Sequence, residues 1–303
     1  MHHILSADEF TRDHLMAIFT LTDELRRQAK ANRQELAGRH RGSIVATLFY
    51  EPSTRTRLSF ESAAQRLGMG IISTENARES SSNTKGESLE DTIRTVASYA
   101  DVIVLRHSDD DSAKRAASVS KVPIINAGAG KGEHPTQALL DLYTISRAKG
   151  KTDNLHLVIG GDLKHGRTAR SLAKLIALYP HNHITFVSTP ELGIDNDIKV
   201  YLASHGTTYT EVSELPPALA EADAVYWTRL QKERLEDPRL ESLFSIGQGE
   251  LALMAKDAII MHPLPRNNEI DPTVDADPRA KYFEQVENGL YIRMALLDMA
   301  VHP

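Results

Sequence analysis

A run of hydroxyl and guanidinium side chains, Ser53-Thr-Arg-Thr-Arg57, follows the apolar segment that ends at Tyr50. Backbone N–H groups at a helix start are unpaired and carry partial positive charge, so a helix that begins here would suit a phosphate. The hydroxyls add donors, and Arg55 adds a guanidinium that can bind an anion through two parallel hydrogen bonds. Alone, the run could be a helix cap with solvated arginines. Its place after a buried strand favours an anion site between Arg55 and Arg57.

The segment Ser80-Ser-Ser-Asn-Thr-Lys-Gly86 is the one polar, low-complexity tract of the chain. It could be a flexible surface turn. The alternative is a mobile lid, in which Lys85 and the serine hydroxyls close over a charged substrate.

Two histidine-bearing segments, Arg106-His107 and His134-Pro-Thr-Gln137, stand at a predicted strand end and a predicted helix start. The positive end of a helix dipole disfavours an imidazolium, so we expect His134 to be a neutral donor. A neutral imidazole or a guanidinium aimed at a carbonyl oxygen is what acyl transfer needs for its developing oxyanion. A single histidine is more often structural, however. His134-x-x-Gln137 also lacks the third ligand and the carboxylate of a zinc site, so no metal is expected.

Three further polar loops, 160–167, 227–234 and 262–266, also follow predicted strands. The first is rich in glycine, but its spacing is not G-x-G-x-x-G and the next strand ends without an acidic residue, so NAD is not expected. In His262-Pro-Leu-Pro-Arg266 the prolines hold the chain extended and leave carbonyl acceptors for a substrate NH2 group. Any one of these loops could be structural. Five strand-end loops that carry Arg, and two that carry His-Pro, favour a site.

Strands and helices must alternate along the chain to place these loops. Apolar runs predict nine strands, at residues 43–50, 71–72, 102–105, 122–125, 155–160, 184–188, 207–210, 223–228 and 258–261. Helical spacing of apolar residues predicts helices between them, from 12–30 (with Thr11 as N-cap) to 280–300. The rhythm restarts near residue 150. We therefore expect an α/β protein of two doubly wound domains with mainly parallel sheets, linked by helices, with ligands beyond the carboxyl ends of the strands.

Composition narrows the class of protein further. The 303 residues are 41% hydrophobic and 25% charged, which is typical of a globular protein. With 35 basic and 41 acidic residues, net −6, nucleic acid is not an expected partner. No apolar run approaches the roughly 18–20 residues that span a bilayer, and the start of the chain has no signal-peptide core, so no membrane association is expected. The chain has no cysteine, and we expect an intracellular, cytoplasmic protein.

The residue types also limit the chemistry. No cysteine, G-x-S-x-G elbow or Ser–His–acid order indicates a covalent intermediate, and no carboxylate cluster indicates a metal. The set is rich instead in cationic and neutral donors. Such a site binds a pair of anionic substrates and stabilises a tetrahedral oxyanion by preorganised electrostatics and proximity, so direct group transfer from a phosphorylated donor to an acidic acceptor fits, with no cofactor.

Seven motifs in this order resemble the family of aspartate carbamoyltransferase catalytic chains, from about residue 43 to Leu297. They are Ser53-Thr-Arg-Thr-Arg57, Lys85-Gly-Glu, Arg106-His, His134-Pro-Thr-Gln137, Gly161-Asp-Leu-Lys-x-Gly-Arg167, Thr228-Arg-Leu-Gln-Lys-Glu-Arg234 and His262-Pro-Leu-Pro-Arg266. The resemblance implies that carbamoyl phosphate and L-aspartate give N-carbamoyl-L-aspartate and phosphate, in de novo pyrimidine (UMP) synthesis. It also implies a carbamoyl phosphate-binding domain over 1–133 with helix 289–303 packed on it, an aspartate-binding domain over 134–288, and an active site in the cleft between them.

The resemblance gives each matching residue a role. The phosphate would be held by Ser53, Thr54, Arg55 and Thr56. The carbamoyl oxygen would be polarised by Thr56, Arg106 and His134. The carbamoyl NH2 would be oriented by Gln137 and the carbonyls of Leu264 and Pro265. The aspartate carboxylates would be clamped by Arg167, Arg229 and Gln231.

The lid would act across subunits. In the family, Ser81 and Lys85 enter the site from the neighbouring subunit of a homotrimer. Some members have a second basic residue where this chain has Thr84, so the resemblance carries over Lys85 alone. Whether regulatory chains also bind is left open.

Two rival classes of protein would differ from this chain at particular residues. Ornithine carbamoyltransferases share the donor site but normally have a cysteine in the loop after the last strand, where this chain reads His262-Pro-Leu-Pro. Their acceptor site suits a cation, whereas Arg229 stands where a β-carboxylate would be met. A non-catalytic homologue would be expected to have lost Arg55, Lys85 or His134, and all three are present.

Overall fold

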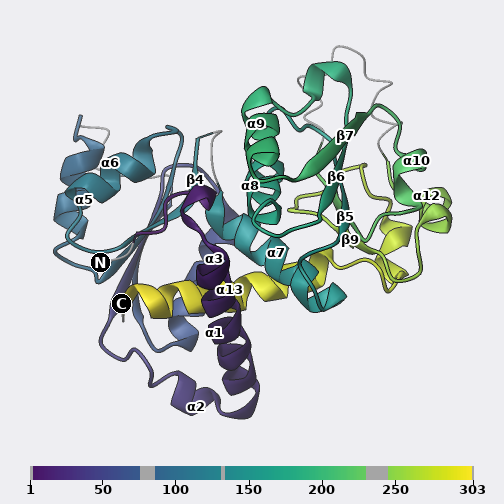
Figure 1. Cartoon of the computed structure of the whole chain (residues 1–303). Helices are drawn as coiled ribbons and strands as arrows, with labels where there is room; N and C mark the ends of the chain where they lie inside the picture. Colours follow the sequence, from purple (N-terminus) through teal and green to yellow (C-terminus); the bar gives the residue numbers. More distant parts are fainter. Residues whose placement is uncertain (1–2, 76–85, 131–133, 230–244, 302–303) are drawn as a thin grey trace. The chain divides into compact units, whose positions relative to one another are not determined.

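The computed structural model describes residues 3–75, 86–130, 134–229 and 245–301 (Figure 1). The chain divides into two compact units, unit 1 with Met1–Thr136 and Glu287–Pro303, and unit 2 with Gln137–Val286. Both boundaries fall inside helices, α7 (Pro135–Lys149) and α13 (Tyr282–Val301). The expected linkage of two α/β units by helices is confirmed.

Unit 1 is built on a four-stranded parallel sheet in the order β2-β1-β3-β4. Its strands are β1 (Ile44–Phe49), β2 (Gly70–Glu75), β3 (Val102–His107) and β4 (Ile124–Ala129). The continuous apolar run of β1 is buried after its first residue, as expected for a central strand covered on both faces. The edge strand β2 is largely exposed, and it is six residues long rather than the two predicted.

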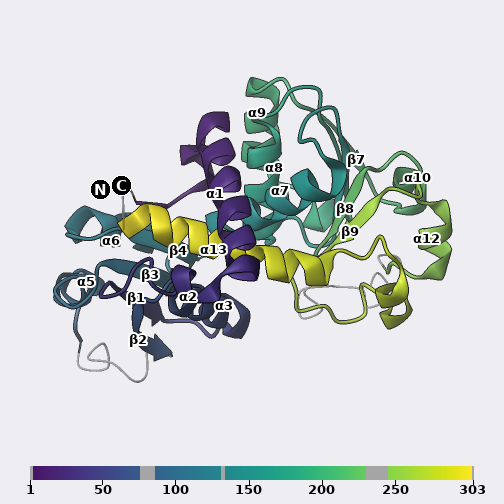
Figure 2. The same ribbon diagram turned by 90° about the horizontal axis from the view of Figure 1, so that it is seen from below.

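Helices surround this sheet. They are α1 (Arg12–Ala31), α2 (Arg33–Leu36), α3 (Thr54–Arg66), α5 (Leu89–Val96) and α6 (Ser112–Val119), with the 3-10 turn η1 (Ala7–Glu9) before them. Thr11 caps α1 as predicted, because its hydroxyl accepts a hydrogen bond from the N–H of His14. Residues 287–301 of α13 return to this unit beside α1 (Figures 1 and 2), where Arg26 donates to Asn288.

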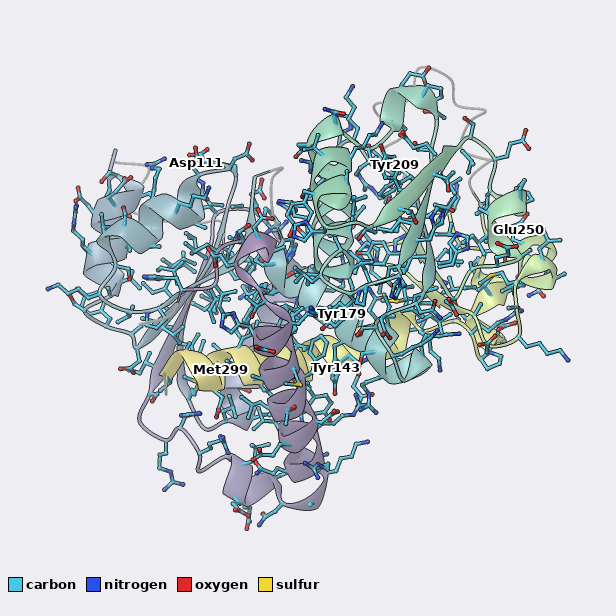
Figure 3. The ribbon with its side chains drawn as sticks, viewed as in Figure 1. Asp111, Tyr143, Tyr179, Tyr209, Glu250 and Met299 are labelled. Carbon is cyan, nitrogen blue, oxygen red and sulfur yellow. The ribbon has the colours of Figure 1, made fainter. Side chains whose placement is uncertain are left out.

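Unit 2 has a five-stranded parallel sheet in the order β7-β6-β5-β8-β9. The strands are β5 (His156–Gly160), β6 (His183–Val187), β7 (Thr208–Val212), β8 (Ala224–Trp227) and β9 (Ile259–Met261). Tyr209 (labelled in Figure 3) comes from the edge strand β7, and its ring lies 6.2 Å from the ring of Phe186 on β6.

The helices of unit 2 cover both faces of this sheet. Helices α8 (Arg167–Ile176) and α9 (Asn196–Ser204) lie together on one face, and α10 (Pro216–Leu219) and α12 (Gln248–Leu253) lie on the other (Figures 1 and 2). Two 3-10 turns, η3 (Pro190–Leu192) and η5 (Pro272–Ala276), complete the unit. Trp227 is fully buried in the core beneath α10 and α12.

All nine predicted strands are present, and the two sheets separate on either side of residue 150. The fold class predicted from the alternation of strands and helices is therefore confirmed. Among the described residues, no helix combines the length and apolar composition needed to cross a membrane.

Candidate active site

The start of α3 has the features of an anion-binding helix end. Ser53 is the N-cap, its side chain makes no capping hydrogen bond, and the first turn contains no acidic residue. The first helical N–H with a backbone acceptor is that of Arg57, which donates to the Ser53 carbonyl at 3.0 Å. Within the described part of the chain, the N–H groups of Thr54, Arg55 and Thr56 therefore remain available to a ligand.

The two arginines of this segment differ in their partners. Arg55 is exposed and makes no hydrogen bond or ion pair with any residue that the structure describes. Partial desolvation lowers the pKa of its guanidinium, which nevertheless stays charged. Arg57 is instead engaged, 3.3 Å from a carboxylate oxygen of Glu61 and 2.7 Å from one of Glu75. The prediction of an anion between Arg55 and Arg57 is wrong, because Arg57 is already neutralised.

Two more predicted residues of unit 1 come from the same edge of its sheet. Arg106 is next to last in β3 and pairs in register with Phe49, the last residue of β1. Its Nη1 donates to the carbonyl of Ala127 at 3.2 Å, and its Nη2 lies 3.8 Å from Glu51. His134 is buried and directly precedes α7, as predicted. Because β1, β3 and β4 are neighbours, the α3 start, Arg106 and His134 all follow the carboxyl ends of adjacent strands.

In unit 2, Arg167 and Arg229 follow the neighbouring strands β5 and β8. Arg167 is the first residue of α8, and Arg229 lies two residues after β8. Gly160 explains how these strand ends can approach each other, since a Cβ added there would lie 2.0 Å from the Trp227 ring. The N–H and the hydroxyl of Thr228 both donate to the Gly160 carbonyl, at 2.8 and 2.9 Å. The two arginine-bearing loops are thereby fixed to each other.

Gln137, in the first turn of α7, is nearly buried, and its Nε2 donates to Asp141 at 2.8 Å. Its Oε1 is therefore the atom left as an acceptor, which suits a substrate NH2 group.

Leu264 and Pro265 follow β9, the strand next to β8, and are joined by a cis peptide bond. Leu264 has a φ of 52°, in the left-handed region that a leucine rarely adopts. The backbone N–H of Leu264 donates to Nδ1 of His262 at 2.8 Å, which fixes this unusual backbone. A strained backbone held by a specific hydrogen bond is a frequent feature of ligand-binding loops.

Not every predicted motif residue belongs to the site. Arg266 is an ion-pair partner of Asp275 and lies 3.0 Å from the Tyr282 hydroxyl, which is a structural role. The predicted residues Ser81, Lys85 and Gln231 lie outside the described residues, as does the lid from residue 80 to 85. Asp141, Glu269 and Gln285, which contact the predicted groups, were missed. The Gln137–Asp141 spacing of four residues on a helix was the one signal that could have found Asp141.

A separate pocket of about 540 Å³ lies in unit 2 near the amino ends of β5 and β6. His156 and His183 line it, with ring centroids 5.0 Å apart. Burial and the neighbouring His156 lower the pKa of His183. None of the predicted site residues lines this pocket.

Comparison with known proteins places both halves of the chain in one family. Residues 2–147 match the carbamoyl-P binding domain of the aspartate/ornithine carbamoyltransferase family, and residues 153–300 match its Asp/Orn binding domain. The chloroplastic aspartate carbamoyltransferase of Oryza sativa subsp. japonica is 50% identical over 98% of this chain and 84% of its own length. The aspartate carbamoyltransferase catalytic subunit of Methanocella arvoryzae is 47% identical over 99% of this chain and 97% of its own.

Solved structures match nearly the whole chain as well. The catalytic subunit of M. jannaschii aspartate transcarbamoylase has a TM-score of 0.94 and 42% identity, covering 99% of this chain and 98% of that one. Aspartate transcarbamoylase from Trypanosoma cruzi, in complex with carbamoyl phosphate and aspartate, has a TM-score of 0.93 and 38% identity, covering 99% and 95%.

The two α/β units, each built on a parallel sheet, carry cationic side chains and carbonyl groups in the loops that follow their strands. The chain belongs to the aspartate/ornithine carbamoyltransferase family and is an enzyme of the carbamoyl-transferring class.

Proposed function

We propose that the chain transfers the carbamoyl group of carbamoyl phosphate to the amine of L-aspartate, giving N-carbamoyl-L-aspartate and phosphate, in pyrimidine (UMP) synthesis. Relatives that are 44–50% identical to this chain are named as aspartate carbamoyltransferases. The T. cruzi enzyme was crystallised with carbamoyl phosphate and aspartate.

The observation that carries the proposal is the start of α3. Three helical N–H groups without acceptors in the described residues, an arginine without a partner there and no acidic residue in the first turn form a cationic cradle. A phosphate would neutralise it, and Thr54 and Ser53 would add hydroxyl donors.

The proposed reaction begins with that cradle holding the phosphate. Thr56, Arg106 and His134 donate to the carbamoyl oxygen and stabilise the negative charge that grows there. The neutral amine of aspartate attacks the carbamoyl carbon, a C–N bond forms, and the oxygen becomes the oxyanion of a tetrahedral intermediate. The intermediate collapses by breaking the bond to the phosphate oxygen, and the departing phosphate takes the proton of the amine. Every group in this sequence is supplied by the chain or by the two substrates, so we propose that no cofactor takes part.

The acceptor specificity follows from charge. Arg167, Arg229 and Gln231 would bind the two carboxylates of aspartate, which a cationic ornithine side chain would not replace. Gln137 Oε1 and the carbonyls of Leu264 and Pro265 would accept hydrogen bonds from the carbamoyl NH2. The loops that carry Arg167 and Arg229 are fixed to each other through Gly160 and Thr228, which supports a rigid clamp.

Assembly is part of the same proposal. We propose a cytoplasmic homotrimer in which Ser81 and Lys85 of one subunit complete the site of the next. The plant relatives are named chloroplastic.

The test is an activity assay with purified protein, carbamoyl phosphate and either L-aspartate or L-ornithine, run beside a measurement of native mass. We expect turnover with aspartate and none above background with ornithine. Turnover with ornithine alone, or with neither amino acid, would overturn the proposal.

A further inference from the structure

Asp141 is a fully buried carboxylate on α7, and two amide side chains converge on one of its oxygens. Its Oδ1 lies 2.8 Å from Nε2 of Gln137 and 2.6 Å from Nε2 of Gln285. Gln285 is also buried and lies in α13, so residues 144 positions apart meet at one atom. All of them belong to unit 2.

The shared carboxylate fixes which way each amide faces. An oxygen of Asp141 can accept from an NH2 group but cannot pair with an amide oxygen, so a flipped Gln137 would lose this bond. Gln137 therefore presents Oε1, an acceptor, on its other side. In Gln285 the same constraint leaves Oε1 to accept from the backbone N–H of His262, at 3.0 Å.

The chain of hydrogen bonds continues from His262 to the Leu264 backbone. Because Nδ1 of His262 accepts from the N–H of Leu264 at 2.8 Å, its proton must be on Nε2. Nε2 lies 3.0 Å from Oε1 of Glu269, which accepts a hydrogen bond from this N–H group. Burial alone would raise the pKa of Glu269, but the bonds from His262 and from the N–H of Asn267 hold that pKa below its ordinary value. A charged Glu269 locks the His262 tautomer.

We propose that Asp141 and Gln285 are positioning residues that hold both kinds of acceptor, the Gln137 side chain and the Leu264–Pro265 carbonyls, toward the NH2 group of the substrate. This inference rests on the proposed function. Neither residue touches substrate; each acts through Gln137 or through His262 and Leu264. An NH2 group differs from a methyl group of similar size by its two N–H donors, so these acceptors are what select a carbamoyl over an acetyl group.

The experiment compares carbamoyl phosphate with acetyl phosphate, which has CH3 in place of NH2. The variant is Gln285→Met, which keeps the length of the side chain and removes both hydrogen bonds. The control is Gln248→Met, the same change at an exposed position of α12 in the same unit. KM for carbamoyl phosphate, kcat, and the inhibition constant of acetyl phosphate against carbamoyl phosphate are measured for all proteins.

We expect Gln285→Met to lower kcat/KM for carbamoyl phosphate by about 10- to 100-fold, through a higher KM or a lower kcat. The inhibition constant for acetyl phosphate should change by less than about twofold. A role in packing alone would weaken both ligands together, and that outcome would overturn the inference. So would an unchanged kcat/KM. Wild-type protein that does not use carbamoyl phosphate at all would overturn the proposed function instead.

A second variant, Gln285→Glu, guards against misfolding of the first. Its carboxyl group reproduces the donor and the acceptor of Gln285 only when protonated, because a carboxylate facing Asp141 has no proton to donate. We expect its defect in carbamoyl phosphate KM, measured relative to wild type at each pH, to shrink as the pH falls from 8 to 6. A defect independent of pH would contradict the hydrogen-bonding role.

Discussion

His40 Nε2 lies 2.6 Å from Oδ1 of Asp298, which joins the segment before β1 to the C-terminal helix α13 across 258 residues of sequence. Both side chains are buried, and Arg39 also donates to Asp298. The pair closes unit 1, because the returning end of α13 is held to the segment that leads into the central strand.

This contact predicts a pH-dependent stability. Burial would raise the pKa of Asp298, but the hydrogen bonds from His40 and Arg39 lower it below its ordinary value. A carboxyl group of this kind stabilises the fold above its unfolded-state pKa, and the stabilisation is lost as the pH falls through its folded-state pKa. We expect Asp298→Asn to cost about 1–3 kcal/mol in the free energy of unfolding at pH 7. The difference from wild type should shrink toward pH 3, measured by urea denaturation at each pH. A difference of constant size across this range would contradict the role of the charge.

A second prediction concerns Arg55. Removing an oxyanion-type donor typically costs ~10²–10³ in turnover, and Arg55 also faces the proposed phosphate site. We expect Arg55→Ala to lower kcat by at least this factor with carbamoyl phosphate and aspartate. Arg66→Ala, in the last turn of the same helix, is the matched control and should retain wild-type kcat. Equal kcat for the two variants would contradict a role of the start of α3 in the reaction.

The central strands were predictable because they are continuous apolar runs, and the longer helices because their apolar residues recur at helical spacing. The strand-end rule then placed Arg106, Arg167 and Arg229 correctly from local sequence alone. The ion pair of Arg57 with Glu75 was not predictable, since Glu75 reaches Arg57 only because β2 pairs with β1. The same holds for Gln285, whose contact with Asp141 depends on two distant helices meeting. Sequence reveals residues able to bind an anion, and tertiary pairing decides which of them remain available.

The lid offers a prediction about assembly. If Lys85 acts in the site of a neighbouring subunit, inactive Lys85→Ala and inactive His134→Ala subunits can form hybrid trimers with some intact sites. We expect activity to return when the two proteins are mixed under conditions that exchange subunits, verified by native mass spectrometry of a tagged pair. Unmixed variants carried through the same treatment are the reference. Absence of recovery after proven exchange would argue against shared sites.

The last prediction tests the close approach of β5 and β8. A Cβ at Gly160 would lie 2.0 Å from the ring of Trp227, which is fully buried and cannot move without disturbing the core. Overpacking of this kind typically costs about 1–3 kcal/mol, so we expect Gly160→Ala to lower the free energy of unfolding by at least this amount. Gly249 in α12 has nothing within 4 Å of its added Cβ, and Gly249→Ala should be neutral or stabilising by up to about 1 kcal/mol.

Gly160→Ala should also affect the acceptor site. Because the Gly160 carbonyl receives both hydrogen bonds from Thr228, this variant should displace Arg229 and raise KM for aspartate. Thermal denaturation and steady-state kinetics of the two alanine variants would separate these effects. A stable Gly160→Ala protein with wild-type KM for aspartate would refute the proposed link between the close approach of β5 and β8 and the acceptor site.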